Sequence, residues 1–122
     1  MNRTGGAAIR RKALRRGSFS ESLAVWALRL RGYRIMARNF RCPFGEIDIV
    51  ARKGDTIAFV EVKARASVAD AVDAVSAEAQ QRIANAGEAW IGRQRDWEKL
   101  SWRFDIVAVL PRRWPVHLPD AF

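Results

Sequence analysis

The sequence contains only one cysteine, Cys42, and only one histidine, His117. A single cysteine excludes a disulfide within the chain and fits a protein of the reducing cytoplasm, where we expect this one to reside. Because zinc sites combine several cysteine and histidine ligands, the pair argues against a structural zinc centre. Cys42 has no evident base partner, which argues against a thiol nucleophile. His117 stands in a proline-rich tail, where we expect a solvated side chain.

Long apolar runs and glycine-rich phosphate loops are also missing. No segment approaches the roughly 18 to 20 uninterrupted apolar residues that a membrane-spanning helix needs, so we expect no membrane contact. The segment "GSFSES" lacks the lysine of a P-loop. A chain of 122 residues without repeats suits a single domain with one hydrophobic core.

Acidic residues are absent from the first sixteen positions, which hold six basic ones: Arg3, Arg10, Arg11, Lys12, Arg15 and Arg16. The formal net charge is +9, so the rest of the chain is only mildly basic. We expect residues 1–16 to form a flexible basic arm, which either contacts phosphate groups or is simply solvated. Residues 17–122 are then the single folded domain.

Two segments have helical periodicity. Ser18 and Glu21 have the spacing of a capping box, and Gly32 suits the end of the same helix. The apolar residues between them predict one buried stripe: Phe19, Leu23, Trp26, Ala27 and Leu30. A second helix is expected from Ser76, with an apolar face formed by Ala79, Ile83, Ala86 and Trp90.

The remaining periodic segments predict strands over 33–40, 46–52, 56–65 and 102–111. Lys53, Gly54 and Asp55 predict a tight hairpin turn between the second and third strands. The order is helix, three strands, helix, strand, which indicates an α/β sandwich whose final strand joins the sheet in parallel. The tail 111–122 holds three of the four prolines and is expected to be irregular.

Four charges interrupt the two strands of the predicted hairpin: Glu46, Asp48, Glu61 and Lys63. Because strand side chains alternate between faces, Glu46 and Asp48 share one face of their strand, and Glu61 and Lys63 share one face of the next. If these faces coincide, Asp48 and Glu61 converge beside Lys63. Two facing carboxylates repel, and a divalent cation such as Mg²⁺ would offset that repulsion. Such a metal would help ionise an attacking water, which Lys63 could orient or deprotonate.

A plainer interpretation stays open for each of these residues. Alternating charges are normal on the solvated face of an antiparallel sheet. The capping box alone explains Glu21, and Glu46 suits a solubility charge at a strand edge. Asp105 suits an ordinary polar position before a buried run.

The blocks "ARNFRCPFGEIDIVA", "FVEVKAR" and "RFDIVAV", in this order and spacing, resemble the YraN family of uncharacterised bacterial proteins. The resemblance covers residues 17–110. That family is placed in the PD-(D/E)xK, or restriction-endonuclease-like, superfamily and is similar to archaeal Holliday-junction resolvases. The resemblance implies an α/β fold with a mixed β-sheet flanked by helices, and an Mg²⁺ or Mn²⁺ site at one edge of the sheet.

The resemblance also implies roles for individual residues. Asp48 and Glu61 match the metal ligands, and Lys63 matches the motif lysine. Glu21 matches an acidic residue that many members contribute from the first helix. Gln80 matches, less closely, a polar group that faces the site from the helix after the motif strand.

Two positions depart from the family pattern. Relatives commonly have glycine where this chain has Ser20, and lysine where it has Ala79. If that lysine grips phosphate in relatives, binding here would be weakened or rearranged.

The expected function is a metal-dependent endonuclease-like protein that acts on DNA, with branched DNA as a candidate substrate. Arg34, Arg38 and Arg41 would contact backbone phosphates. Two symmetric cuts in a junction would favour a homodimer. One alternative is an inactive nucleic-acid-binding module of a repair or uptake complex. Another is a protein–protein scaffold in which the charges are only a solvated sheet face.

Overall fold

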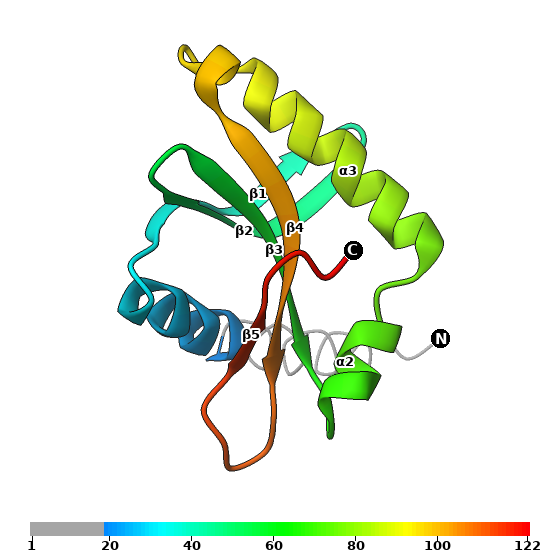
Figure 1. Ribbon diagram of the computed structural model, residues 1–122. Helices are drawn as coiled ribbons and strands as arrows, with labels where there is room; N and C mark the ends of the chain where they lie inside the picture. The colour runs from blue at the N-terminus through cyan, green and yellow to red at the C-terminus, as the bar shows by residue number, and fades with distance from the viewer. Residues whose placement is uncertain (1–18) are drawn as a thin grey trace, which may run out of the picture.

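Alternating apolar side chains build five strands that pair in the order β1-β2-β3-β4-β5. Their bounds are Arg34–Cys42, Gly45–Lys53, Thr56–Ala64, Ser101–Val109 and Val116–Leu118. Neighbouring strands are antiparallel except β3 and β4, which are parallel. The computed structural model describes residues 19–122 (Figure 1), so the predicted arm 1–16 and Ser18 lie outside the described part. The expected mixed sheet, with its final long strand joined in parallel, is confirmed.

Helices cover both faces of the sheet (Figure 1). The N-terminal helix, residues 19–30 of the described part, packs on one face, and α3 (Ala77–Gly92) packs on the other. The short α2 (Val68–Asp73) and α3 form the crossover from β3 to β4, and the 3₁₀ turn Trp97–Lys99 precedes β4. A crossover through a helix is what allows two sequential strands to run in parallel. Within residues 19–122, none of the helices has the length and apolar character needed to span a bilayer.

Two tight turns follow the glycines that the sequence offers for them. Gly54, at φ +62°, lies in the two-residue loop that joins β2 to β3. Gly32, at φ +92°, ends the N-terminal helix. The N–H of Gly32 donates to the carbonyl of Arg29, and the N–H of Tyr33 donates to the carbonyl of Leu28. These two bonds form a Schellman motif, which satisfies carbonyls that the helix end leaves open. Both predicted turns are therefore confirmed.

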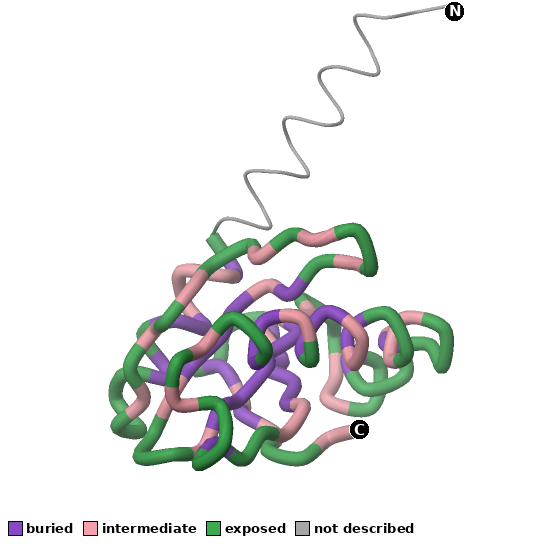
Figure 2. Tube along the Cα trace, turned by 90° about the horizontal axis from the view of Figure 1, so that it is seen from above, coloured by how far each residue is buried: buried purple, intermediate pink, exposed green. Residues whose placement is uncertain are grey.

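The apolar layer under α3 confirms the predicted face of that helix. Ile83, Ala86 and Trp90 are buried against the sheet, together with Phe59 of β3. Phe59 stacks edge to face with Trp90, at 6.0 Å between ring centroids. This layer covers the side of β3 that also carries Glu61 and Lys63. The purple segments gather toward the middle of the molecule in Figure 2, and β2, β3 and β4 contain many of the buried residues.

The predicted stripe of the N-terminal helix is mostly wrong. Phe19, Trp26 and Leu30 are 67, 56 and 72% exposed, although Ala27 is buried as expected. The helix instead buries smaller residues: Ala24, Val25, Ala27 and Leu28. Small side chains allow a closer approach to the sheet, where two alanines, Ala51 and Ala58, face the helix in the same cluster. The large apolar groups are left on the outer surface.

The C-terminal tail contains the strand β5 and a buried histidine, which the sequence analysis did not predict. His117 is only 9% exposed, so the expectation of a solvated side chain is wrong. Its Nε2 donates to the fully buried Asp105 at 2.7 Å, and its Nδ1 accepts from Arg31 at 2.9 Å. Asp105 also accepts from Arg103 and from the backbone N–H of Asp120. Burial favours the neutral acid, but these hydrogen bonds outweigh it and lower the pKa of Asp105. Asp105 therefore anchors the tail to β4.

Candidate active site

The candidate site lies where β2 and β3 stop pairing. Their register runs from Lys53↔Thr56 to Ile49↔Val60 and ends one residue before Asp48 and Glu61 would face each other. The Asp48 carboxylate replaces the missing ladder bond, because its Oδ2 accepts from the backbone N–H of Val62 at 2.9 Å. β3 continues past this point by pairing with β4. The two strands thus diverge with a carboxylate from each at the opening.

The regular alternation of β2 also breaks at Asp48. Ile47 and Val50 pack in the same apolar cluster although they are three residues apart, whereas Ile49 packs on the opposite face. Beside Asp48, the β1 residue Asn39 has φ +52°, a left-handed conformation in which asparagine is among the favoured non-glycine residues. The prediction that Asp48 and Glu61 converge therefore rested on an alternation that the structure does not keep at Asp48. The two carboxylates lie where the strands stop pairing, and the charge of Asp48 acts on Glu61.

Glu61 is the carboxylate whose ionised form is strongly disfavoured by its surroundings. It is only 9% exposed, and its Oε1 is buried with no hydrogen-bond partner among the described residues. Its Oε2 lies 4.0 Å from Lys63 Nζ. Burial and, after it, the charge of Asp48 raise the pKa of Glu61 to about 8, against the weaker opposing effect of Lys63. The plain interpretation of a solvated sheet face is therefore wrong for this residue.

Asp48 is perturbed in the same direction. Burial raises its pKa, the hydrogen bond from Val62 lowers it, and the charge of Glu21 raises it. Its Oδ1 has no hydrogen bond among the described residues, so one oxygen remains free to bind a ligand. A divalent cation would relieve the repulsion between Asp48 and Glu61 and would occupy the unpartnered oxygens of both. The donor set of carboxylate oxygens is the kind that Mg²⁺ and Mn²⁺ prefer.

Lys63 and Glu21 lie at the edge of this pair. Lys63 follows Glu61 on the same face of β3 and keeps a quarter of its side chain exposed, so its ammonium can meet both solvent and substrate. Glu21, on the N-terminal helix, accepts from Asn39 Nδ2 at 3.3 Å and lies 3.7 Å from Arg38. Within residues 19–122, no three acidic, histidine or cysteine side chains stand close enough to bind one metal ion. Glu21 therefore reaches the site through its charge and through Asn39, not as a third ligand of a closed cage.

The predicted nucleic-acid contacts fall into two groups. Arg34, Arg38 and Arg41 are exposed on β1, which is an edge strand of the sheet. Arg41 pairs with Glu46 at 3.5 Å, which keeps Glu46 outside the carboxylate pair. Gln80 donates instead to the Val75 carbonyl at 3.2 Å, and no contact joins it to the carboxylates in the described part of the chain.

Asn39 is the site residue that the sequence analysis missed. It positions the Glu21 carboxylate and sits opposite the break in β2. The only signal for it is an asparagine inside an otherwise alternating strand, since asparagine tolerates the left-handed conformation better than most residues.

Comparison with known proteins places this chain in a family. A family model described as "Uncharacterised protein family UPF0102" matches residues 20–109. A UPF0102 protein of Rhizobium etli is 63% identical over 115 residues, which cover 94% of both chains. Similar proteins from Mesorhizobium japonicum and Chelativorans are 56% and 54% identical, over 94% and 93% of this chain and 92% and 91% of theirs. The chain therefore belongs to the uncharacterised protein family UPF0102, the YraN family whose motifs it carries, within the PD-(D/E)xK nuclease-like superfamily.

Proposed function

We propose that the protein is a metal-dependent endonuclease that binds DNA, with branched DNA as its substrate class, and hydrolyses phosphodiester bonds. The observation that carries the proposal is the buried pair of Asp48 and Glu61, with an unpartnered Glu61 oxygen beside Lys63. Carboxylates whose pKa values are raised by burial and by each other's charge cluster at functional sites.

The chain's own residues divide the chemistry between them. Asp48 and Glu61 would hold an Mg²⁺ or Mn²⁺ ion, which when bound stabilises negative charge on the phosphate and lowers the pKa of water. Lys63 orients the attacking water or neutralises the phosphate, because its ammonium lies next to Glu61 and still reaches solvent. Glu21, held by Asn39, pairs with Arg38 at the edge of the site.

The exposed arginines of β1 supply the DNA contacts in this proposal. An edge strand with Arg34, Arg38 and Arg41 on its surface suits a phosphate backbone, since such contacts give affinity without sequence specificity. A homodimer would set two sites for two cuts in a junction.

An inactive DNA-binding module is the second candidate, and the environment of Ala79 favours it. Ala79 lies in the first turn of α3 and packs, half-buried, against the core, where relatives commonly carry a lysine. Without a phosphate-gripping cation in this turn, phosphate binding would be weakened or rearranged, and cleavage, which needs the phosphate held in place, would fall with it. Ser20, the other departure, is buried.

One experiment separates these functions. Labelled linear, nicked, flap and four-way DNA are incubated with the protein in Mg²⁺, Mn²⁺ or EDTA. Endonuclease function predicts metal-dependent cleavage that Asp48→Ala and Lys63→Ala abolish, whereas Glu46→Ala, which removes an exposed neighbouring charge, leaves it intact. Binding without cleavage in every metal would support the inactive module. Neither binding nor cleavage would leave the scaffold as the surviving interpretation.

A further inference from the structure

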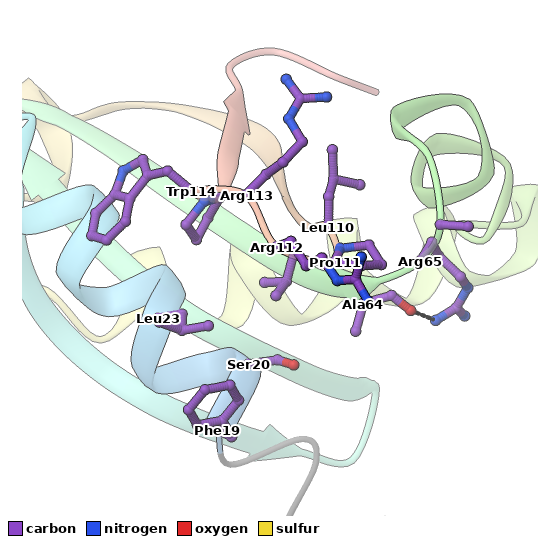
Figure 3. Close-up of a pocket in the computed structure, with 13 residues that line it drawn as sticks. Phe19, Ser20, Leu23, Ala64, Arg65, Leu110, Pro111, Arg112, Arg113 and Trp114 are labelled. Atoms are coloured by element: carbon purple, nitrogen blue, oxygen red, sulfur yellow. Dashed lines mark hydrogen bonds between the residues drawn. The ribbon is translucent and has the colours of Figure 1, made fainter.

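A groove of about 910 Å³ lies between the start of the N-terminal helix and the loop that joins β4 to β5 (Figure 3). Leu23 of the helix and Val109 and Leu110 at the end of β4 give it an apolar lining. Two aromatic residues stand at its walls: Phe19 from the helix and Trp114 from the loop. The sequence analysis had assigned Phe19 to the core, so the groove exists because the helix turns its large apolar groups outward.

Both aromatic residues contribute little to the packing of the fold, because more than half of each is exposed to solvent. Phe19 is 67% exposed and Trp114 is 56% exposed. Neither ring forms an aromatic or cation–π pair with another described residue. Exposed rings that line a hollow offer a stacking surface for flat ligands.

The charge around the groove has a single sign. Arg65, Arg112 and Arg113 contribute to its lining, and no carboxylate does so among the described residues. The guanidinium of Arg65 bonds its neighbouring carbonyl, that of Ala64, at 2.8 Å, so it is held at the rim (Figure 3). In the same view the Arg113 side chain extends away from the N-terminal helix. Aromatic walls with arginines at the rim are the combination that binds bases and phosphates together.

The groove begins next to two residues of the candidate active site along the chain, although no site residue lines it. Ala64 and Arg65 follow Lys63 directly on the chain, and Ser20, which also lines the groove, precedes Glu21. A DNA strand with its phosphate at Lys63 could continue past the end of β3 toward Arg65 at the rim of the groove. Bases can stack on Phe19 and Trp114 only if they are unpaired.

We propose that this groove binds unpaired nucleotides of a single-stranded DNA segment that adjoins the phosphate at the active site. The inference rests on the proposed function and sharpens it, because it makes a junction or flap with a single-stranded arm the preferred substrate. A second copy of the chain is a poorer occupant, because a two-fold contact through this groove would bring the arginines of both copies together.

The test measures binding of a labelled single-stranded thymidine oligonucleotide by fluorescence anisotropy, in EDTA so that no cleavage occurs. Trp114→Ala should weaken binding about tenfold, and Trp114→Phe should restore most of the loss, because stacking on one base is worth about 1–3 kcal/mol. Trp97→Ala is the matched control, since Trp97 is 52% exposed in the 3₁₀ turn and does not line the groove. Blunt duplex DNA should bind Trp114→Ala and wild type equally.

The arginines give a second, independent readout. Arg65→Ala should reduce the slope of log affinity against log salt by about 0.7 on the single strand, the value of one phosphate contact. Arg95→Ala, an exposed arginine that does not line the groove, should leave the slope unchanged.

Each result supports or overturns the inference. Equal single-strand binding by Trp114→Ala and Trp97→Ala overturns it. The inference is also overturned if Trp114→Ala, but not Trp97→Ala, changes the oligomeric state measured by sedimentation, because the groove would then be a contact between copies of the chain. If Trp114→Ala loses single-strand binding but the wild-type protein never cleaves DNA, the nuclease proposal is refuted and the groove proposal stands. If cleavage is lost in Asp48→Ala but single-strand binding and cleavage are unchanged in Trp114→Ala and Arg65→Ala, the groove proposal is refuted and the nuclease proposal stands.

Discussion

Replacing Glu61 by glutamine tests the electrostatic account of the site while keeping its shape. Burial and, after it, the charge of Asp48 raise the pKa of Glu61 from 4.5 to about 8 in the folded, metal-free protein. Between these two values the folded state holds a proton that the unfolded chain has released. Stability conferred by that proton is therefore complete below about pH 4.5 and is lost as the pH rises through about 8.

The magnitude follows from the size of the shift. One pKa unit corresponds to about 1.4 kcal/mol, so the whole shift corresponds to about 5 kcal/mol of unfolding free energy lost by about pH 9. Water that enters the gap between β2 and β3 as Glu61 ionises would screen part of this loss, and we expect ~2–3 kcal/mol to appear. Glutamine stays neutral at every pH, so Glu61→Gln should be more stable than wild type by that amount at about pH 9. Urea unfolding in EDTA, repeated from about pH 5 to 9, measures the difference.

Metal addition provides the complementary measurement. At about pH 9, Mn²⁺ should stabilise wild type, because a ligand that binds only the folded state raises its unfolding free energy. Glu61→Gln should gain much less, and Glu46→Gln should behave as wild type in both series, because that carboxylate is exposed and pairs with Arg41. If Glu61→Gln loses stability with rising pH as steeply as wild type, Glu61 is not the perturbed group and the reasoning fails.

Two further predictions concern the scaffold. His117→Ala should lower the unfolding free energy at neutral pH by about 2–3 kcal/mol, because it strips a hydrogen bond from the buried Asp105, and urea unfolding would detect this. An unchanged midpoint would show that the tail does not depend on this bond. Gly87→Ala should destabilise by about 1–2 kcal/mol, since its new Cβ would lie 2.9 Å from the Phe59 ring, whereas Gly92→Ala meets nothing within 4 Å and should be neutral or slightly stabilising. Equal melting temperatures for the two alanine variants would contradict the close packing of α3.

The strands were predictable because their pattern is local. Alternation in "EIDIVAR" and "TIAFVEVKAR", with Gly54 between them, suffices to specify a hairpin. The parallel placement of β4 was equally accessible, because a strand reached through a helix returns to the sheet in that sense. Both inferences use only the neighbours of each residue along the chain.

The N-terminal helix was mispredicted because two apolar faces compete for the sheet. Periodicity favours the stripe with the larger side chains, which includes Phe19, Trp26 and Leu30. The sheet surface decides otherwise, since Ala51 and Ala58 present a flat region on which Ala24 and Leu28 fit closely. The width available between a helix and a sheet is a tertiary property that no window of the sequence contains.

His117 and Asp105 show the same limitation for polar residues. Each looks ordinary in its own segment, one in a proline-rich tail and the other in a strand. Their pairing depends on β5 returning beside β4, with Val107 opposite His117 in the register. Burial of a charged or titratable group is then acceptable, because Arg103 and Asp120 supply the remaining hydrogen bonds.

The acidic residues themselves were predictable, but the reason that they lie together was not. In a regular hairpin, Asp48 and Glu61 would face each other within a continuous ladder, and their repulsion would weaken the pairing. Here the hydrogen-bonded ladder between β2 and β3 ends at Ile49 and Val60. One oxygen of Asp48 accepts a hydrogen bond from the N–H of Val62, and the other accepts none among the described residues. Asp48 therefore satisfies a backbone N–H that the break leaves without a ladder partner, and the break places both carboxylates where the two strands stop pairing. One local irregularity, beside Asn39 on the neighbouring strand, accounts both for the tolerance of charge inside the sheet and for the position of the candidate site.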